Sequence, residues 1–517
     1  MKRSRKKMGT VYLVGAGPGD PGLLTLRAKE CLEAADAVFY DHLVNPEILR
    51  HCRGAALCDV GKRSYRGHVP QARIERQLVQ AARRFRRVVR LKGGDPFIFG
   101  RGGEEAQALR RAGVPFEVVP GVTSAVAAPA YAGIPLTHRR FGSSVTFLTG
   151  HEEPGKGRSR SEGPALDWEA LAREPTLVFL MGVKTLRENF RRLLAHGKKP
   201  STPAALIEWG TYPRQRVVVG DLRSLPRLAE RAAIQAPAIA VVGELVGLRR
   251  DLAWFEQRPL FGRKILVTRA PGQASALSRS LREAGAQALE LSALSFGPPK
   301  SWRAFDRACA CAESYDWLVF SSRNAVEACL TRLEDRRLGP AVFRHARVAA
   351  VGPMTADRLR EAGLRVHRQP KEFNAMALAA TFSPRELQGK RVLFPRAERG
   401  REEAIALLQG KGAKVDRVTV YRSLAPKVSR RELRQLFAGG LPDLLTFTSG
   451  AAAEHLAAML RGTPYAAALR KVPALVIGPV TRSAARRAGW KVVAVAKQAT
   501  IESMADAVED YFSKRKY

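Results

Sequence analysis

The stretch Arg90–Glu105 (RLKGGDPFIFGRGGEE) holds the residues of this sequence best suited to enclosing a small ligand. Two glycine pairs, the first at Gly93–Gly94, bracket Asp95 and an aromatic strip. Glycine allows backbone to approach a ligand closely, so backbone groups and Asp95 can surround a zwitterionic or hydroxylated molecule. The alternative is a glycine-rich hairpin with Phe97 and Phe99 in the core.

A second glycine-rich loop, Gly15–Asp20 (GAGPGD), follows the apolar strand expected at Val11–Val14 and precedes a helix expected at Leu24–Ala34. It is not the dinucleotide fingerprint GxGxxG, because Asp20 stands where the third glycine would fall and Pro18 stiffens the loop. A loop of this kind can hold a ligand, and it can equally be a structural turn between strand and helix.

Apolar strands alternate with helices through the first half, which predicts an α/β fold with a largely parallel sheet. The strands are expected at 11–14, 37–40, 88–91, 118–119, 176–180 and 238–242. Two more loops, Pro120–Ala125 and Gly133–Arg139, lie at strand ends. Ligands bind at the carboxyl ends of strands in such sheets, so the sequence predicts a site formed by several loops at one edge.

The second half contains an internal duplication. Four segments recur in the same order and at nearly constant spacing: Val267–Ala270 as Phe394–Ala397, Leu281–Gly285 as Leu408–Gly412, Trp317–Asn324 as Leu444–Ala451, and Ala350–Thr355 as Val476–Thr481. Repeats of this kind mark repeated structural units. The second half is therefore predicted to form two similar α/β lobes.

The charge of the chain favours a polyanionic partner. Lys and Arg number 87 against 48 Asp and Glu, a net charge of +39, which suits nucleic acid, an anionic membrane or a highly carboxylated small molecule. The basic residues are scattered, with few aromatics between them, so charge alone leaves nucleic acid open. No apolar run approaches the roughly 20 residues of a membrane span, and no apolar segment follows the basic residues 1–8 as it would in a signal peptide.

The cysteines and histidines show no metal-binding pattern. The six cysteines form no CxxC pair, and the nine histidines form no HExxH motif. We therefore expect no metal, no disulfide framework and a reducing cytoplasm.

The first half resembles the tetrapyrrole methylase family, and within it uroporphyrinogen-III C-methyltransferase. The resemblance rests on GAGPGD, YDHLV at Tyr40–Val44, VGK at Val60–Lys62, the Arg90–Glu105 stretch, VVPGVTSA, AGIPLTHR, and FLMGV at Phe179–Val183. It covers about residues 9–250 in the family's motif order. It implies two α/β lobes, an S-adenosylmethionine cofactor as methyl donor, and a homodimer.

The same resemblance implies positions for the cofactor contacts. They fall on Pro18, Gly93, Gly94, Asp95, Ile98, Thr123, Ser124, Met181 and Gly210. Ser124 stands where several relatives have alanine, a change that a backbone contact should tolerate.

The implied reaction transfers two methyl groups to uroporphyrinogen III through precorrin-1, giving precorrin-2. Asp41 and Lys62 match the family's proposed base and acid. Asp41 could instead be a turn cap, and Lys62 could pair with a substrate carboxylate. Plausible partners for the substrate carboxylates are Arg63, Arg66, Arg101, Arg139 and Arg140.

Residues 262–517 resemble uroporphyrinogen-III synthase in the order of VTRA, YDWLVFSS, AVGPMTADRLREAG, VYRS, FTSGAA and IGPVTRSAARRAG. The implied reaction closes hydroxymethylbilane with inversion of its last ring, loss of water and no cofactor. Tyr421 matches the family's tyrosine, and the alternative is a half-buried strand residue. Hydroxyls suited to carboxylate binding, or simply to helix capping, are those of Ser321, Ser322, Thr355, Thr448, Ser449 and Thr481.

The sequence thus predicts a basic tail at 1–8, a two-lobed methyltransferase at 9–251 split near 120, a linker at 252–261 and a synthase at 262–517. The product of the second unit would be the substrate of the first, on the sirohaem or cobalamin branch. The expected partners are polycarboxylate tetrapyrroles, with no nucleic acid and no membrane. The alternatives are an RNA methyltransferase of the same fold, and a non-catalytic tetrapyrrole-binding second half.

Overall fold

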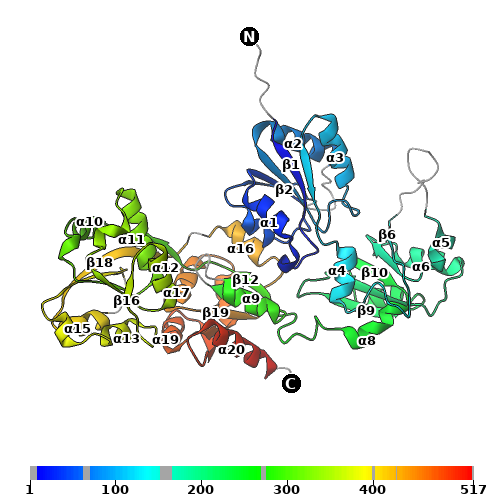
Figure 1. Ribbon diagram of the computed structural model, residues 1–517. Coiled ribbons are helices and arrows are strands. Elements are labelled where there is room, and N and C mark those ends of the chain that lie inside the picture. Colours follow the sequence, from blue (N-terminus) through cyan, green and yellow to red (C-terminus); the bar gives the residue numbers. More distant parts are fainter. Residues whose placement is uncertain are drawn as a thin grey trace, which may run out of the picture. The chain divides into compact units, whose positions relative to one another are not determined.

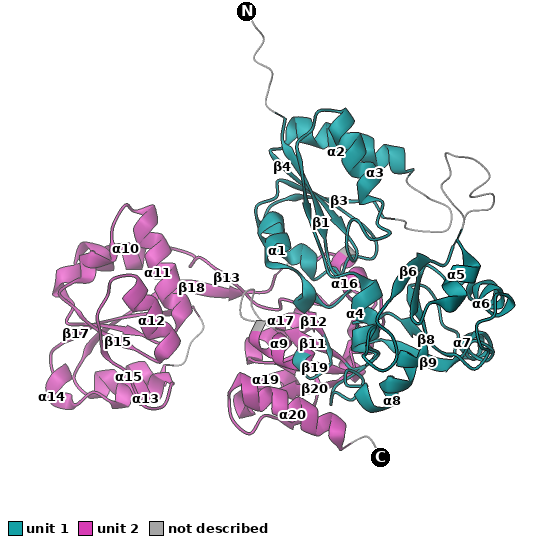
Figure 2. Ribbon diagram, turned by 45° about the vertical axis from the view of Figure 1, so that its right-hand side comes forward, with its two compact units in different colours: residues 1–263, 283–287 teal, residues 264–282, 288–517 magenta. Residues whose placement is uncertain are grey.

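The computed structural model describes residues 8–61, 70–151, 166–268, 275–398, 402–426 and 428–514. The chain divides into two compact units (Figure 2). Unit 1 comprises residues 1–263 and 283–287, and unit 2 comprises residues 264–282 and 288–517.

The first sheet of unit 1, to which the blue strands β1 and β2 of Figure 1 belong, is entirely parallel, with strand order β3-β2-β4-β1-β5. Its strands are β1 (Thr10–Gly15), β2 (Ala37–Tyr40), β3 (Ala56–Asp59), β4 (Arg87–Lys92) and β5 (Phe116–Val119). Helices α1 (Leu26–Glu33), α2 (Gln71–Arg84) and α3 (Gly102–Arg111) cover it. The helix expected at Leu24–Ala34 is confirmed as α1, which begins after a Thr25 cap that accepts from the Ala28 N–H at 3.2 Å.

Burial on both faces explains the apolar runs of these strands. In β4, Val88 packs with α2 and α3, whereas Val89 and Leu91 pack with α1. Arg90 and Lys92 share the face of Val88, because side chains alternate along a strand. Two cations therefore enter the covered face of a buried strand.

The second sheet of unit 1 has the order β6-β7-β10-β8-β9. Its strands are β6 (Thr146–Thr149), β7 (Leu177–Leu180), β8 (Pro203–Glu208), β9 (Arg216–Asp221) and β10 (Ala238–Val242). Among the described strands of this sheet, only β6 and β7 pair in parallel. The expectation of a largely parallel sheet is therefore wrong for this lobe. The loop between β8 and β9 contains no helix, and so short a connection can join only antiparallel neighbours.

Helices α4 (Ser124–Tyr131), α5 (Trp168–Arg173), α6 (Leu186–Ala195), α7 (Leu225–Arg231) and α8 (Arg249–Leu252) accompany the second sheet. Ala125 and Ala128 of α4 pack against its strands. The segment predicted as a linker packs in this unit too: the Trp254 indole donates to the Ala130 carbonyl at 3.0 Å, and Phe255 stacks edge-on against Tyr131.

Unit 2 contains two sheets of matching order. The first is β12-β11-β19-β20-β21, and the second is β13-β18-β17-β14-β15-β16. The first comprises β11 (Lys264–Thr268), β12 (Gln287–Glu290), β19 (Leu444–Phe447), β20 (Pro473–Val476) and β21 (Lys491–Val495). The second comprises β13 (Ser295–Gly297), β14 (Trp317–Phe320), β15 (Arg347–Ala350), β16 (Val366–Arg368), β17 (Arg391–Ala397) and β18 (Lys414–Leu424).

Each of these sheets combines strands from both copies of the duplicated segment. β11 and β12 of the first copy lie beside β19, β20 and β21 of the second. β17 and β18 of the second copy lie beside β14, β15 and β16 of the first. The prediction of two similar lobes is confirmed, but neither lobe corresponds to one continuous repeat.

The helices of unit 2 follow the same duplication. They are α9 (Ser275–Glu283), α10 (Arg303–Ala310), α11 (Arg323–Asp335), α12 (Pro353–Glu361), α13 (Ala375–Ala380), α14 (Pro384–Leu387), α15 (Glu403–Gly410), α16 (Arg430–Leu436), α17 (Gly450–Met459), α18 (Ala466–Lys471), α19 (Pro479–Arg487) and α20 (Ile501–Ser513). Among the described residues, no helix has the length and apolar composition needed to cross a membrane.

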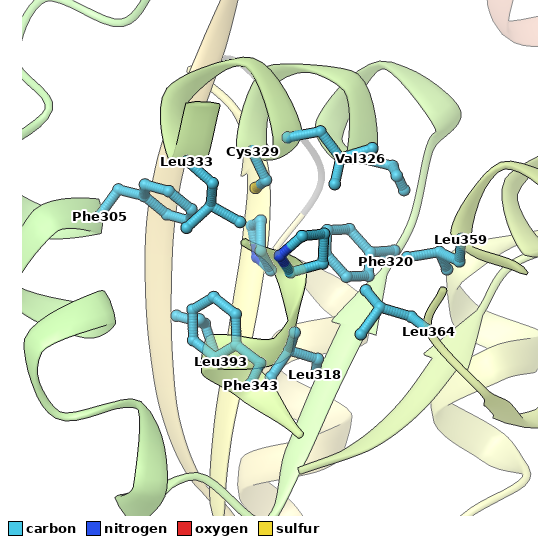
Figure 3. A pocket seen from close by; sticks show the side chains of 13 residues that line it. Phe305, Leu318, Phe320, Val326, Cys329, Leu333, Phe343, Leu359, Leu364 and Leu393 are labelled. Atoms are coloured by element: carbon cyan, nitrogen blue, oxygen red, sulfur yellow. The ribbon is translucent and has the colours of Figure 1, made fainter. Parts of the chain in front are cut away.

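A small cavity lies within the lobe built on β14 and β17 (Figure 3). Its lining is apolar and includes Phe305, Phe320, Phe343 and the Cys329 thiol. These residues belong to the buried core of the lobe. The cavity is therefore a packing defect of the core and offers nothing to a charged ligand.

Candidate functional site

Three glycine loops meet at the carboxyl edge of the first sheet. A Cβ atom added to Gly15 would lie 2.5 Å from the Gly121 Cα and 2.7 Å from the Gly94 oxygen. The Gly17 N–H donates to the Gly94 oxygen at 3.1 Å, and the Gly94 N–H donates to the Gly17 oxygen at 2.8 Å. Only glycine permits this backbone contact, so the loops after β1, β4 and β5 form one cradle.

Asp95 shapes this cradle from within. Its Oδ1 accepts from the N–H groups of Phe97 and Ile98 at 2.7 and 3.1 Å, and its Oδ2 accepts from the Gly121 N–H at 3.0 Å. Three backbone donors fix the carboxylate, so it ties the loop after β4 to the loop after β5. Phe97 is 53% exposed and Phe99 is 42% exposed, so the alternative of two core phenylalanines is wrong.

The other predicted cofactor positions of this lobe lie on the same loops. Pro18 follows Gly17, and a Cβ added to Gly93 would lie 3.3 Å from the Leu43 side chain. Thr123 caps α4 by accepting from the Ala125 N–H at 3.3 Å, and a Cβ added to Gly94 would lie 3.7 Å from the Ser124 nitrogen. The structure thus brings Pro18, Gly93, Gly94, Asp95, Thr123 and Ser124 to one edge.

Met181 and Gly210 come from the second sheet. Gly210 packs against Ala128 of α4 and lies between two residues with left-handed backbone, Trp209 and Thr211. The Thr211 hydroxyl accepts from the Asp20 N–H at 3.1 Å, so the loop after β8 holds the GAGPGD loop. Met181 follows β7 with φ of 57° and is 58% exposed.

Asp41 follows β2 and is joined to buried charges. Arg90 Nη2 donates to Asp41 Oδ1 at 2.6 Å, and Lys92 Nζ lies 4.0 Å from Asp41 Oδ2. Behind them, Glu105 Oε1 accepts from Arg90 Nε and Lys92 Nζ, both at 3.1 Å. The Asp41 side chain is 30% exposed, whereas the other three side chains are buried.

The surroundings shift the pKa values of both cations. Burial lowers the pKa of Arg90, but the charges of Asp41 and Glu105 outweigh burial, so the pKa lies above its ordinary value. Burial and then the neighbouring Arg90 charge hold the pKa of Lys92 below its ordinary value, against the opposing effect of the two carboxylates. Sequence reasoning did not single out Lys92 or Glu105. The signal was present as two cations, Arg90 and Lys92, at alternate positions in the buried part of β4.

The predicted acid and several predicted substrate contacts lie outside the described residues: Lys62, Arg63 and Arg66. Arg101 pairs with Glu104 on α3 at 2.6 Å. Arg139 and Arg140 are exposed in the turn closed by His138 and Gly142. Across the described part of the chain, no group of three His, Cys, Asp or Glu residues could hold a metal, and all six cysteines are free.

In the second unit, Tyr421 lies on β18 and contacts the loop that follows β14. Its hydroxyl lies 3.2 Å from Ser322 Oγ, and its ring meets Phe296 edge-on with centroids 5.5 Å apart. Ser322 also caps α11 by accepting from the Ala325 N–H at 3.2 Å. The sequence named both residues, and the structure adds the contact between them.

The remaining predicted hydroxyls of unit 2 lie at equivalent points of the two lobes. Ser449 caps α17 through the Ala452 N–H at 3.2 Å, as Ser322 caps α11. Thr355 and Thr481 are buried in the first turns of α12 and α19. Ser321 and Thr448 are half-buried and follow β14 and β19. The duplication therefore produces two similar clusters of hydroxyls at strand ends.

Comparison with known proteins assigns both halves. Residues 10–226 match the family model for tetrapyrrole (corrin/porphyrin) methylases, and residues 275–506 match that for uroporphyrinogen-III synthase HemD. The porphyrin biosynthesis protein HemD of Ruminiclostridium josui is 37% identical over 499 residues, which is 96% of this chain and 97% of that protein. The chain belongs to the family of this protein. Along this chain, the methylase match precedes the synthase match. The predicted fusion and the α/β fold class are confirmed.

Two further proteins resemble the methylase half. The uroporphyrinogen-III C-methyltransferase of Bacillus subtilis (strain 168) is 46% identical over 286 residues, 55% of this chain and 58% of that protein. The uroporphyrin-III C-methyl transferase of Thermus thermophilus, solved in complex with S-adenyl homocysteine, is 41% identical, with 46% of this chain and all of that chain covered and a TM-score of 0.40.

Proposed function

We propose that the methylase half transfers two methyl groups from S-adenosylmethionine to uroporphyrinogen III, and that the synthase half makes that uroporphyrinogen III from hydroxymethylbilane. The product, precorrin-2, leads toward sirohaem or cobalamin. The observation that carries the first activity is the meeting of three glycine loops at one sheet edge, where a side chain at Gly15 or Gly121 would clash with the backbone of the neighbouring loops.

This cradle fits the methyl donor. The backbone of Gly93 and the N-terminal turn of α4 at Thr123 and Ser124 offer donors and acceptors to a zwitterionic nucleoside. They lie beside Gly94, whose backbone groups bond to Gly17. Exposed Ile98 and Met181 supply apolar contact, and Pro18 and Gly210 would line the same ligand. When bound, S-adenosylmethionine supplies an electrophilic methyl group, and the loops act by positioning it.

Asp41 is the base of this proposal. Each methylation forms a carbon–carbon bond and turns the sulfonium into a neutral thioether, which leaves one positive charge on the macrocycle. Loss of a proton to Asp41 removes that added charge, and the partly exposed carboxylate can then pass the proton to water. Lys62 is the matching acid, in keeping with the VGK motif.

Charge recognition brings the substrate to the site. Uroporphyrinogen III is a polycarboxylate, and a net charge of +39 attracts such an anion before any specific contact forms. Arg101, Arg139 and Arg140 present guanidinium groups that can pair with carboxylates.

In the synthase half, Tyr421 is the proton donor. Hydroxide leaves hydroxymethylbilane together with a proton as water, and the cationic azafulvene then closes on the inverted ring with loss of a proton. The Tyr421 hydroxyl, held 3.2 Å from Ser322 Oγ, suits the first of these transfers. No cofactor takes part in this scheme.

The organisation of the chain completes the proposal. The catalytic units are residues 9–251, split near 120, and residues 262–517, with a connecting segment at 252–261. We propose a homodimer formed through the methylase half, which analytical ultracentrifugation tests. The six free cysteines suit a reducing cytoplasm.

The proposed function is tested with uroporphyrinogen III and labelled S-adenosylmethionine. Label in precorrin-2 supports it. Label in RNA, with none in the porphyrinogen, would favour the RNA methyltransferase alternative. Binding of hydroxymethylbilane without release of uroporphyrinogen III would favour a non-catalytic second half.

A further inference from the structure

A buried charge cluster lies behind Asp41, formed by Arg90, Lys92 and Glu105. Arg90 and Lys92 occupy alternate positions of β4 and face α3, which supplies Glu105. Their exposed fractions are 2%, 3% and 0%. Nothing in the proposed binding of the methyl donor or the substrate uses these three side chains.

Arg90 and Lys92 each connect the buried Glu105 carboxylate to Asp41. Glu105 Oε1 accepts from Arg90, from Lys92 and, at 3.2 Å, from Gln71 Nε2 of α2. Glu105 Oε2 is buried and has no hydrogen-bond partner. At the other end, Arg90 contacts one Asp41 oxygen and Lys92 approaches the other. Asp41, at 30% exposure, therefore connects the buried cluster to solvent.

Burying charges in this way is an expensive means of stabilising a fold. Well-packed apolar residues of similar volume often stabilise a core as well or better than a buried ion network. The neighbouring Val88 and Leu109 show that apolar side chains already fill this region. The cluster is better explained by its effect on the one carboxylate that leaves the core.

We propose that Arg90, Lys92 and Glu105 are positioning residues that hold the Asp41 carboxylate ionised and in one orientation, ready to accept a proton from the macrocycle. The inference rests on the proposed function, because it concerns the base of that reaction. Arg90 and Lys92 each face a different Asp41 oxygen, which restricts rotation of the carboxylate. Glu105 balances their charge and fixes both cations from behind.

Other titratable groups lie on the elements around Asp41. They are His42 beside it, Asp59 on β3, Glu75 on α2, and Arg101 with Glu104 at the start of α3. All of them are retained in the variants below, so a displaced pH profile reports a change within the cluster.

The test compares Lys92→Met and Glu105→Gln in the full-length chain. Methyl transfer to uroporphyrinogen III is measured across pH, and S-adenosylhomocysteine binding is measured by calorimetry. Lys92→Met removes a positive charge 4.0 Å from Asp41 Oδ2, so the acid limb of kcat should move to higher pH by about one unit. Glu105→Gln removes a negative charge instead of a positive one, so the acid limb of kcat in this variant should not move to higher pH. Binding of S-adenosylhomocysteine should stay within about twofold in both variants.

A matched control removes a cation from a buried carboxylate elsewhere in the unit. Arg216→Met deprives Glu208, whose side chain is 6% exposed, of its ion-pair partner. It should lower the melting temperature and leave the pH profile in place. A purely structural role of the cluster would make Lys92→Met behave in the same way.

An unmoved acid limb in Lys92→Met overturns the inference, and so does a Glu105→Gln limb displaced to higher pH. If Lys92→Met does not fold, the acid limb of kcat in Glu105→Gln tests the inference by itself. Displacement of that limb to higher pH overturns the inference, and any other position supports it. Methylation by the unaltered chain separates these outcomes from failure of the proposed function. If the proposed function were wrong, the unaltered chain would not methylate uroporphyrinogen III.

Discussion

The candidate catalytic groups of the two units lie in opposite electrostatic settings. Asp41 is bonded to Arg90 and backed by a buried network of charges. Tyr421 contacts the neutral Ser322 hydroxyl and the Phe296 ring. One unit thus supports its group with full charges, and the other does so with a hydroxyl and an aromatic edge.

This difference matches the direction of the proposed proton transfers. A base must remain ionised in a partly buried site, and a carboxylate there requires counter-charges. A phenol that donates a proton is neutral beforehand and requires only a hydrogen-bond partner. The comparison teaches that the methylase half should depend on the buried charged residues behind its catalytic group, whereas the synthase half should depend on neutral contacts.

The largest effect is expected from Asp41→Asn. Methyl transfer should fall by roughly 10²–10⁴, the usual contribution of a general base, while ring closure by the synthase half is unchanged. Asp36→Asn is the matched control, because Asp36 precedes the same strand and its carboxylate accepts from the Arg86 and Arg87 N–H groups. Equal losses in the two variants would remove Asp41 from the reaction.

The next effect concerns stability. Glu105→Ala leaves Arg90 and Lys92 buried without their shared carboxylate and should lower the free energy of unfolding by roughly 3–5 kcal/mol. Arg173→Ala, which breaks the exposed pair with Glu169, should change it by less than about 1 kcal/mol. Urea unfolding of the two variants measures the difference. Similar decreases in the free energy of unfolding would show that the buried network stabilises the fold no more than an exposed ion pair does.

Tyr421→Phe should slow closure of hydroxymethylbilane by roughly 10². Methylation of supplied uroporphyrinogen III should be unaffected. Tyr315→Phe is the control, because the Tyr315 hydroxyl lies in the same lobe and donates to Asp416 Oδ2 at 2.8 Å. Burial, and then this hydrogen bond, raise the pKa of Tyr315. Rapid uroporphyrinogen III formation by Tyr421→Phe would refute the assignment.

The smallest effect is expected from Ser322→Ala. It removes a helix cap, at a cost of about 1 kcal/mol, and frees the Tyr421 hydroxyl, so ring closure should slow by about tenfold or less. Ser429→Ala removes the comparable cap of α16, which accepts from the Glu432 N–H at 3.1 Å, and should lose stability alone. Equal ring-closure rates in the two variants would show that Ser322 serves only as the N-cap of α11.

The sequence predicted those parts of the fold that depend on local pattern. The strands at Ala37–Tyr40 and Ala238–Val242 have the expected bounds, because apolar runs between turns identify buried strands. The exchange of strands between the repeats of unit 2 could not be predicted, since a duplication shows which segments are alike and says nothing of which ones pair. The antiparallel β8–β9 hairpin was missed for a similar reason.

The same limit applies to the candidate site. Glycines at strand ends indicated the cradle, because close contact between backbone segments requires glycine. The cluster behind Asp41 depends on α3 folding over β4, so the meeting of Glu105 with Lys92 is a long-range event in the chain. Tyr421 and Ser322 were each predicted, and their contact depended on β18 crossing to the lobe of β14.

The central claim is that one chain makes and then methylates uroporphyrinogen III. The most direct measurement supplies the purified full-length chain with hydroxymethylbilane, first alone and then with S-adenosylmethionine, and identifies the products. We predict uroporphyrinogen III in the first reaction and precorrin-2 in the second. Formation of only the uninverted isomer, or of uroporphyrinogen III that remains unmethylated when the methyl donor is present, would contradict the account.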